Sequence, residues 1–348
     1  MQTNHPAITL AKTAGFCFGV NRAVQMVYRL LAQGERVCTL GPIIHNPQLV
    51  NDLAERGVII VNSPSDAPKD AVLVIRSHGV TRQTMEELER LGIRFEDATC
   101  PFVKKIHRIV QQAAEEGHAV WIAGDENHPE VKGIKSYCRD AAFVFQNEQE
   151  LQNLLKEHTK WKERQISVVA QTTFHANLWK KCVVSIKKVY TNAVIFDTIC
   201  NATSERQAEA ERLAQNTDLM IVVGGRESSN TAKLQDVCRK YCDTCLIESA
   251  HELDTEKVRQ ASSICVTAGA STPAGIIKEV LKTMSEIIDP VAKSEPVAAA
   301  ADAVNNEPVA AEPPAEVVEE KAQKSFDEMT YEEALEASLN SMNTDQKV

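Results

Sequence analysis

Apolar and polar positions along this chain follow two periodicities in turn. Runs of four or five apolar residues, such as 119–123 and 219–223, are typical of buried strands. Longer segments lie between them, and their apolar residues recur every three or four positions, as in Val20–Ala32, which predicts amphipathic helices. Strands that alternate with helices in this way predict the α/β class with parallel sheets.

The same order of elements occurs three times. Each repeat starts at a cysteine and continues with a predicted helix, a predicted strand and a polar turn that begins with glycine. The spacing from cysteine to glycine is 24 residues in every repeat, and the pairs are Cys17 with Gly41, Cys100 with Gly124, and Cys200 with Gly224. Three equal spacings without a gap indicate three equivalent modules.

Each module continues with a second helix, a short strand and a later strand that ends in another small polar turn. These second turns are 77–79, 171–173 and 268–271. Ligands of parallel sheets gather beyond the carboxyl ends of the strands. We therefore expect a trefoil of three pseudo-equivalent α/β modules, at 8–97, 98–196 and 197–288, whose cysteines and six polar turns meet at one centre.

The end of the chain has a different composition. Residues 290–320 are rich in Ala, Pro, Glu and Val, which predicts a disordered linker, and 326–342 predicts a short capped helix. Residues 290–348 contain 13 acidic residues and 4 lysines, whereas the rest has 35 acidic and 34 basic residues. The net charge of −10 therefore belongs to the 289–348 tail, and the nearly neutral body is not a typical nucleic-acid binder. The tail is either a solvated end or a tether.

Ten cysteines occur in a chain without a signal-peptide pattern or an apolar run long enough to span a membrane, which predicts a cytoplasmic protein. In a reducing compartment, cysteines act more often as metal ligands or catalytic groups than in disulfides. Cys17, Cys100 and Cys200 each precede a predicted helix, whose N-terminus favours the thiolate. Three converging thiolates are typical of an iron–sulfur cluster with one open iron. The alternative is three buried structural cysteines.

A second cysteine motif competes with this interpretation. Cys238-x3-Cys242-x2-Cys245 has the spacing found in radical enzymes that use S-adenosylmethionine. However, Cys238 and Cys242 fall on a predicted helix and Cys245 begins a predicted strand. The radical-enzyme motif requires a loop after an early barrel strand.

Polar residues of the turns supply further candidate chemistry. His45, His78 and His128 could bind zinc, or could bind an anion and supply protons. Ser228, Ser229, Asn230 and Ser271 precede predicted helices, where hydroxyls, an amide and helix N-termini form an anion site unless they only cap the helices. Glu130 is the candidate acid if it is desolvated, and a helix-capping Glu otherwise. Thr172 could relay a proton or orient a substrate hydroxyl.

At these residues the sequence resembles the 4-hydroxy-3-methylbut-2-enyl diphosphate reductase family. The resemblance covers residues 8–288, and its motifs include Gly15-Phe-Cys17-Phe-Gly, Ala98-Thr-Cys100-Pro, Asn127-His128-Pro-Glu130, Gln171-Thr172-Thr173, Asp197-Thr-Ile-Cys200 and Ser228-Ser229-Asn230-Thr231. Neither a Walker lysine loop nor a strand–GxGxxG–helix motif occurs, which argues against nucleotide cofactors.

The resemblance implies one [4Fe-4S] cluster held by Cys17, Cys100 and Cys200 with one open iron. It implies an allylic diphosphate substrate that loses its hydroxyl as water. It further implies that His45, His78, Ser228, Ser229, Asn230 and Ser271 hold the diphosphate beside His128, and that Glu130 delivers the proton with Thr172. A ferredoxin or flavodoxin is the implied electron donor. Some members of the family continue into RNA-binding repeats, so the tail could tether such a region.

Two alternatives stay open at this point. A quinolinate-synthase-like enzyme also sets three cysteines around a cluster with an open iron, but it catalyses condensation and dehydration. A non-catalytic iron–sulfur redox sensor would change redox state without turning over a diphosphate.

Overall fold

The computed structural model describes residues 6–138, 142–157 and 165–289. Within these residues the strands form three four-stranded sheets, and every strand pair is parallel. The orders are β3 (Ile59–Val61)-β2 (Arg36–Leu40)-β4 (Ala71–Ile75)-β5 (Phe95–Asp97), β7 (Ala142–Phe145)-β6 (Ala119–Ala123)-β8 (Ile166–Ala170)-β9 (Val194–Ile195), and β1 (Ala7–Leu10)-β12 (Ser263–Ala268)-β10 (Leu219–Val223)-β11 (Asp243–Ile247). The predicted class, three α/β modules with parallel sheets, is confirmed.

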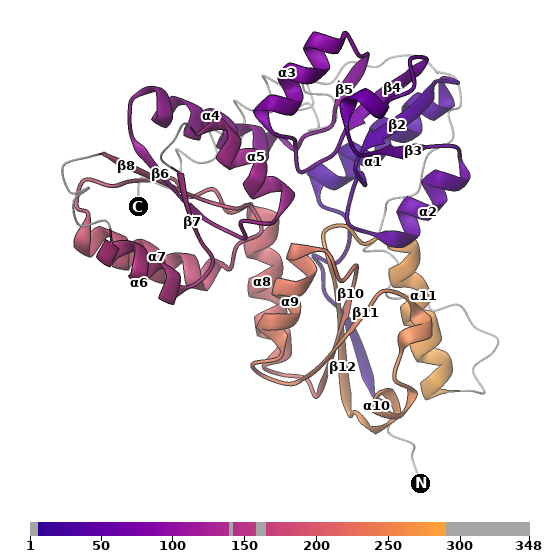
Figure 1. Ribbon diagram of the computed structural model, residues 1–348. Coiled ribbons are helices and arrows are strands. Elements are labelled where there is room, and N and C mark those ends of the chain that lie inside the picture. The colour runs from indigo at the N-terminus through magenta and orange to yellow at the C-terminus, as the bar shows by residue number, and fades with distance from the viewer. Residues whose placement is uncertain (1–5, 139–141, 158–164, 290–348) are drawn as a thin grey trace, which may run out of the picture. The chain divides into compact units, whose positions relative to one another are not determined.

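Helices cover these sheets, as Figure 1 shows for the sheet that contains β6. The first sheet is flanked by α1 (Phe18–Ala32), α2 (Pro47–Glu55) and α3 (Arg82–Leu91), and the second by α4 (Pro101–Glu115), α5 (Pro129–Tyr137), α6 (Glu148–Glu157) and α7 (Ala176–Val189). The third carries α8 (Asn201–Ala214), α9 (Ser229–Cys238), α10 (Thr255–Gln260) and α11 (Ala274–Ile288). Because both faces are covered, the central strands β4, β6 and β10 are continuously apolar, and every residue of these three strands is buried.

The two central strands of each sheet are direct neighbours. The pairs are β2 with β4, β6 with β8, and β10 with β12. In the first two sheets the chain continues from the two strands of the pair to opposite edges of the sheet, and in the third sheet β11 and β1 occupy these two edges. This arrangement is the topological switch point at which α/β sheets bind ligands. The six polar turns follow these six strands, so the topology places both turns of a module side by side.

Strand β1 pairs with β12, from Ala7 opposite Ser263 to Leu10 opposite Val266. The division proposed from the sequence starts the first module at residue 8, whereas β1 joins the sheet of the third module. It takes the position beside the central pair that β5 and β9 take in the other two sheets. We still propose module boundaries at 97/98 and 196/197, and the ends of β5 and β9 just before these positions support them.

Several details differ from the sequence expectations. Helix α9 ends at Cys238, so Cys242 lies beyond it, and Cys245 lies inside β11 rather than at its start. Helix α8 begins at Asn201, directly after Cys200. The predicted linker and the predicted helix over 326–342 lie outside the described residues. No helix in the described part of the chain combines the length and the apolar character that a membrane span requires.

Candidate active site

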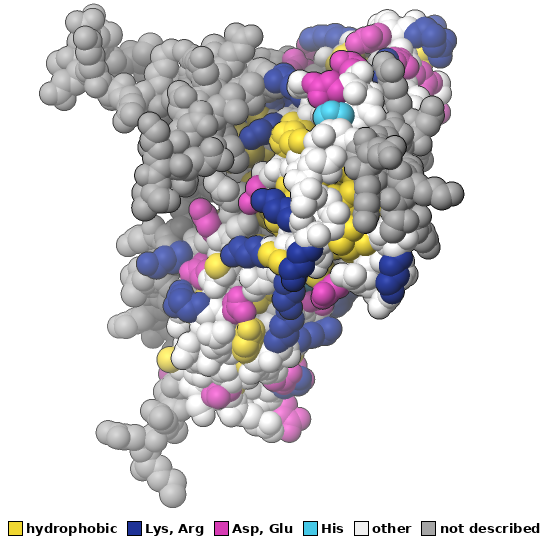
Figure 2. Space-filling view, turned by 90° about the vertical axis from the view of Figure 1, so that its left-hand side faces the viewer, with side chains coloured by type: hydrophobic (Ala, Val, Ile, Leu, Met, Phe, Trp, Pro, Cys, Tyr) yellow, Lys and Arg dark blue, Asp and Glu magenta, His cyan; other side chains and the backbone are white. Residues whose placement is uncertain are grey.

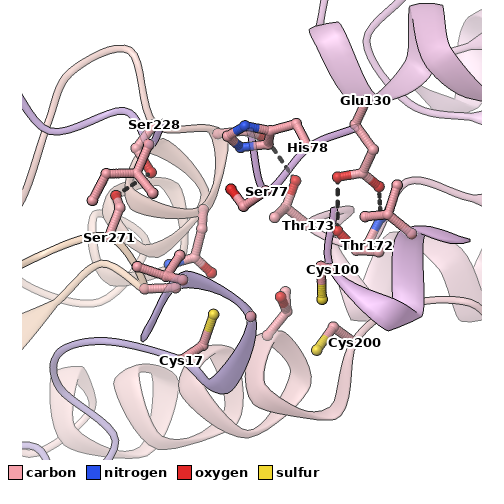
Figure 3. Close-up of a pocket in the computed structure, with 18 of the residues that line it drawn as sticks. Cys17, Ser77, His78, Cys100, Glu130, Thr172, Thr173, Cys200, Ser228 and Ser271 are labelled. Atoms are coloured by element: carbon pink, nitrogen blue, oxygen red, sulfur yellow. Dashed lines mark hydrogen bonds between the residues drawn. The ribbon is translucent and has the colours of Figure 1, made fainter. Parts of the chain in front are cut away.

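One cavity is lined by the three cysteines and by residues of all six polar turns. Figure 3 shows the side chains of Cys17, Cys100 and Cys200 on one side of it and those of His78, Glu130 and Ser228 on the other. All twelve site residues expected from the sequence line this cavity: Cys17, His45, His78, Cys100, His128, Glu130, Thr172, Cys200, Ser228, Ser229, Asn230 and Ser271. The geometry therefore brings the whole predicted set together.

Each cysteine is held by a backbone hydrogen bond to a neighbouring module. The backbone N–H of Cys100 donates to the carbonyl of Ser77 at 2.9 Å, and that of Cys200 donates to Thr172 at 3.0 Å. The N–H of Cys17 donates in the same way to Ala270 at 3.2 Å. In every case the acceptor lies in the second polar turn of the neighbouring module. The cysteines thus hold equivalent positions around the cavity.

The helices start directly after the cysteines, which are their N-cap residues. Pro101 at the first position of α4 has no N–H to lose and a φ angle suited to a helix start. On α1, a side chain on Gly19 would place its Cβ 2.6 Å from Sγ of Cys100. The sequence therefore keeps the space around this sulfur free of side chains.

Burial dominates the protonation of the thiols. Burial and, to a lesser extent, the neighbouring Cys17 and Cys200 raise the pKa of Cys100 to about 12. The N–H groups of Phe102 and Val103 form no capping hydrogen bond with Cys100 and lower its pKa only in part. Burial also raises the pKa of Cys200. At Cys100 and Cys200 the N–H groups of the helix N-termini thus lower the pKa, as the sequence predicts, but burial outweighs them.

These three thiols fit a metal-bound cluster. Thiolates are needed as ligands, and a positively charged metal centre would replace the protons that burial otherwise retains. The cysteines are free of disulfides. The residues present are thus suited to an iron–sulfur group bound by three sulfurs.

Three histidines form a cluster at the opposite side of the cavity. The ring centroids of His45 and His78 lie 4.7 Å apart, those of His78 and His128 5.4 Å, and those of His45 and His128 5.9 Å. One nitrogen of each lies within 4.8 Å of the others, so the geometry leaves the zinc alternative open.

Burial sets the charge of this cluster. It lowers the pKa of His128 to about 4, with a further contribution from His45, and it lowers the pKa of His78 well below its usual value. Nδ1 of His128 accepts a hydrogen bond from the N–H of Glu130 at 3.1 Å, so the neutral ring carries its proton on Nε2. Nε2 of His45 and Nδ1 of His78 are buried without a partner. The cluster therefore has hydrogen-bonding capacity that the protein itself does not use.

The N-terminus of α9 also lines the cavity, beside the cysteines and the histidine cluster. The hydroxyl of Ser228 caps the helix by accepting from the N–H of Thr231 at 3.4 Å, and the hydroxyl of Ser271 lies 3.4 Å from it. Ser271 also donates to the carbonyl of His45 at 3.2 Å. Asn230 is only 4% exposed, and both its amide nitrogen and its amide oxygen are buried without a hydrogen-bond partner. An unsatisfied buried amide is costly, which indicates that a ligand completes its bonding.

Glu130 is the second residue of α5 and is 1% exposed. One carboxyl oxygen accepts from the N–H of Thr172 at 2.7 Å and the other from its hydroxyl at 2.8 Å. Burial raises the pKa of Glu130 to about 7, although both bonds from Thr172 act against the increase. Near neutral pH this carboxyl can therefore hold or release a proton.

Sequence reasoning missed three residues near the cavity. Thr173 lines it and shares a hydrogen bond of 2.9 Å with Ser229, and Ser77 also lines it. Both stand next to residues that were chosen, so adjacency within the polar turns was the available signal. Arg206 on α8 is buried and bonds the carbonyl of Gly15 at 2.6 Å. Arg206 lies six residues after Cys200 and outside the polar turns, so no motif in the sequence pointed to it.

The second cysteine motif lies elsewhere. Cys238 is fully buried in an apolar cluster between α8, α9 and the third sheet, and neither it, Cys242 nor Cys245 lines the cavity. Those thiols face the core of one module, which is the ordinary environment of a structural cysteine.

The fold and the site together define a class of protein: three parallel α/β modules that direct three thiols, a histidine cluster and a buried carboxyl into one cavity. The family model described as LytB protein matches residues 8–285. The chain belongs to this family, as its resemblance predicts.

Curated relatives agree. A protein of Thermoanaerobacter sp. (strain X514), named 4-hydroxy-3-methylbut-2-enyl diphosphate reductase, is 41% identical over 280 residues, which are 79% of this chain and 95% of the relative. A protein of the same name from Geobacter metallireducens is 42% identical over 281 residues, 80% of this chain and 97% of that one. These matches favour the reductase family over the quinolinate-synthase-like alternative.

Solved structures show the same fold. The structure titled as the E-1-hydroxy-2-methyl-but-2-enyl-4-diphosphate reductase from Plasmodium falciparum matches with a TM-score of 0.75 and 27% identity, over 82% of this chain and 89% of that one. A second, titled (E)-4-Hydroxy-3-methyl-but-2-enyl Diphosphate Reductase, the Terminal Enzyme of the Non-Mevalonate Pathway, matches with a TM-score of 0.58 and 38% identity, over 80% and 99%.

Proposed function

We propose that this cavity catalyses the reaction named for the relatives, the reductive removal of a hydroxyl group from 4-hydroxy-3-methylbut-2-enyl diphosphate. Two electrons and two protons convert the allylic alcohol to isopentenyl and dimethylallyl diphosphates, and the oxygen leaves as water. The chain is an oxidoreductase of the non-mevalonate isoprenoid pathway. The observation that carries the proposal is a single cavity that holds three thiols, unpartnered polar groups for an anion, and a carboxyl that titrates near pH 7.

Cys17, Cys100 and Cys200 would hold the iron–sulfur cluster, which we propose to be one [4Fe-4S] cluster with a fourth iron free of protein ligands. When bound, the cluster supplies electrons and a Lewis-acidic iron for the substrate hydroxyl. The protein's part is to hold three sulfurs in equivalent positions through the N–H bonds to Ser77, Thr172 and Ala270.

The diphosphate would be bound opposite the cysteines. Nε2–H of His128 and the unpartnered nitrogens of His45 and His78 are available as donors, since each neutral ring can take either tautomer unless a bond fixes it. Ser228, Ser229, Asn230 and Ser271 add hydroxyl and amide donors at the N-terminus of α9, where the helix dipole favours an anion. The negative charge of a diphosphate would also raise the histidine pKa values that burial lowers.

Glu130 would supply a proton to the departing oxygen. Its carboxyl is desolvated, and Thr172 fixes both oxygens, so the orientation of the acid is set before the substrate binds. The hydroxyl of Thr172 contacts the same carboxyl and could pass the proton on or orient the substrate hydroxyl. Anchoring the distant diphosphate uses binding energy to place the hydroxyl near this acid.

We propose a ferredoxin or flavodoxin as the electron donor, since no nucleotide-cofactor motif occurs in the sequence. Helix α7 carries Lys180, Lys181, Lys187 and Lys188, all exposed, and contains no acidic residue. Figure 2 views the side on which α7 lies in Figure 1 and shows Lys and Arg side chains gathered across the middle of that face. Such a surface would steer an acidic redox protein. We propose a cytoplasmic location, and for the tail an optional tether to an RNA-binding region.

The test is an anaerobic assay. Protein reconstituted with iron and sulfide is mixed with chemically reduced viologen, and viologen oxidation is followed after the allylic hydroxy-diphosphate is added. Rapid oxidation with five-carbon diphosphate products supports the proposal. Absence of oxidation despite full iron and sulfide content contradicts it and favours a redox sensor. Zinc in place of iron in the purified protein would favour the alternative use of the histidine cluster.

A further inference from the structure

Helix α8 holds the segment that leads into Cys17 at two points. Nη2 of Arg206 donates to the carbonyl of Gly15 at 2.6 Å, and Nη1 donates to Ala202 within the helix at 3.0 Å. One turn further along, the carboxylate of Glu209 accepts from the backbone N–H groups of Lys12 at 3.0 Å and Thr13 at 2.9 Å. Because α8 starts directly after Cys200, these contacts connect the segment before Cys17 with the helix that follows Cys200.

The guanidinium of Arg206 is in an unusual environment for a cation. The residue is 5% exposed, and its Nε–H is buried without a hydrogen-bond partner. Among the described residues, no carboxylate oxygen lies within 4.0 Å of its nitrogens. Burying a charge without a paired anion normally costs several kcal/mol, on the order of the effective penalty for one ion. The compensation must come from elsewhere.

The candidates for that compensation are the sulfurs of the cavity. Burial lowers the pKa of Arg206, and the largest opposing contributions come from Cys17 and Cys200, ahead of Glu205 and Glu209. Arginine remains protonated at such a site because its reference pKa lies so high. A permanent positive charge is therefore held between the carbonyls of Gly15 and Ala202, each two residues from one of these cysteines, inside the protein, where water screens it little.

Anchoring alone does not require this burial. On α1, Arg22 forms the same kind of connection, because it donates to the carbonyls of Thr99 and Asp97 just before Cys100, each at 3.3 Å. Arg22 is half-buried rather than buried. An arginine can therefore anchor such a segment without being fully buried, and what the burial of Arg206 adds is a positive charge in the protein interior.

We propose that Arg206 is a positioning residue whose buried positive charge offsets the negative charge on Cys17 and Cys200 and raises the reduction potential of the group they bind. Reduction adds negative charge to that group, and a nearby fixed cation favours the reduced state. This inference rests on the proposed function for the presence of an iron–sulfur cluster. It assigns to Arg206 an electrostatic role that does not involve contact with the substrate.

The experiment is an anaerobic redox titration of the reconstituted full chain, followed by electron paramagnetic resonance. Arg206→Gln removes the charge, and Arg206→Lys keeps a charge but loses the planar fork. Glu209→Gln is the matched control, because it weakens the contact of the same helix with the same segment while removing a negative charge. We expect a more negative midpoint potential for Arg206→Gln, a value near that of the parent for Arg206→Lys, and an unchanged or more positive value for Glu209→Gln.

Two results would overturn the inference. One is a parent-like potential in Arg206→Gln with full cluster content. The other is a shift of all three variants in the same direction, which would show that the connection and not the charge matters. If Arg206→Gln binds too little iron to titrate, the other two variants decide: loss of cluster in Arg206→Lys but not in Glu209→Gln refutes the charge role, and a parent-like Arg206→Lys supports it. A parent protein that titrates normally but does not oxidise viologen would contradict the proposed function alone.

Discussion

Replacing Glu130 with glutamine tests the assignment of the acid most directly. Glutamine has the same shape, and its carbonyl oxygen can still accept from the N–H of Thr172, which donates to Glu130 at 2.7 Å. The Thr172 hydroxyl, now 2.8 Å from the carboxylate, can rotate to accept from the new NH₂ group. Below about pH 4.5, where Glu130 is protonated in both the folded and the unfolded chain, we therefore expect the stability to change by roughly 1 kcal/mol or less, as for exchanging one hydrogen bond for another.

The rate should respond very differently. Glutamine cannot donate a proton, and general acid catalysis contributes about 10²- to 10⁴-fold, so turnover should fall by at least about 100-fold. That loss corresponds to about 2.7 kcal/mol or more in the activation barrier. The measurement is viologen oxidation under saturating substrate, with iron and sulfide determined on the same samples. Glu126→Gln is the control, because Glu126 lies in the same turn but is exposed and pairs with Lys135.

The pH profile provides a second readout of the same variant. Because the pKa of Glu130 is raised to about 7, the protonated donor disappears as the pH rises through 7, and the parent's rate should fall there. The glutamine variant should lose this dependence. A glutamine variant that retains activity within a few-fold of the parent, or a parent profile that stays flat from pH 6 to about 8, would refute the role of Glu130.

Four further outcomes are expected. Cys100→Ser should lose most of the iron and the visible absorbance of the cluster, whereas Cys238→Ser should keep both, and the reverse pattern would favour the radical-enzyme motif. Asn230→Ala should fold normally and raise KM for the diphosphate about 10- to 150-fold, the value of a hydrogen bond of ~1.5–3 kcal/mol to a charged group, and an unchanged KM would remove Asn230 from the site. A chain ending at Ile288 should retain full activity, and a large loss would make the tail part of the enzyme. The free energy of unfolding should also depend on pH, because the pKa of Glu130 is higher in the folded than in the unfolded chain. This difference stabilises the fold by ~3 kcal/mol below about pH 4.5, and the stabilisation should be lost as the pH rises through 7. Denaturation at several pH values measures the effect, and Glu130→Gln should remove this pH dependence.

The sequence was most informative where one local signal was sufficient. Strands β6 and β10 were predicted with their observed bounds, because fully buried parallel strands are short unbroken apolar runs. The equal cysteine-to-glycine spacing then placed the polar turns, and hence the residues of the site, at the switch points of three sheets.

Other features depend on long-range contacts and had no local signal. The pairing of β1 with β12 joins residues at opposite ends of the body, and β1 is a four-residue strand with alternating exposure. Short β9 and the mixed-polarity helix α6 were equally missed. The raised thiol pKa of Cys100 was also unpredictable, since helix position favours the thiolate and only the folded structure shows how strongly burial opposes it.

The pairing of β1 with β12 also affects how the protein is made. Residues 7–10 are synthesised some 250 residues before their partners at 263–266, so the third sheet stays incomplete until β12 has been made. Cys17 is held by Ala270, in the turn that directly follows β12, so its position in the cavity is also set last. Insertion of the cluster into a fully formed site must therefore follow translation of the body, and a nascent chain stalled before β12 should be unable to retain it.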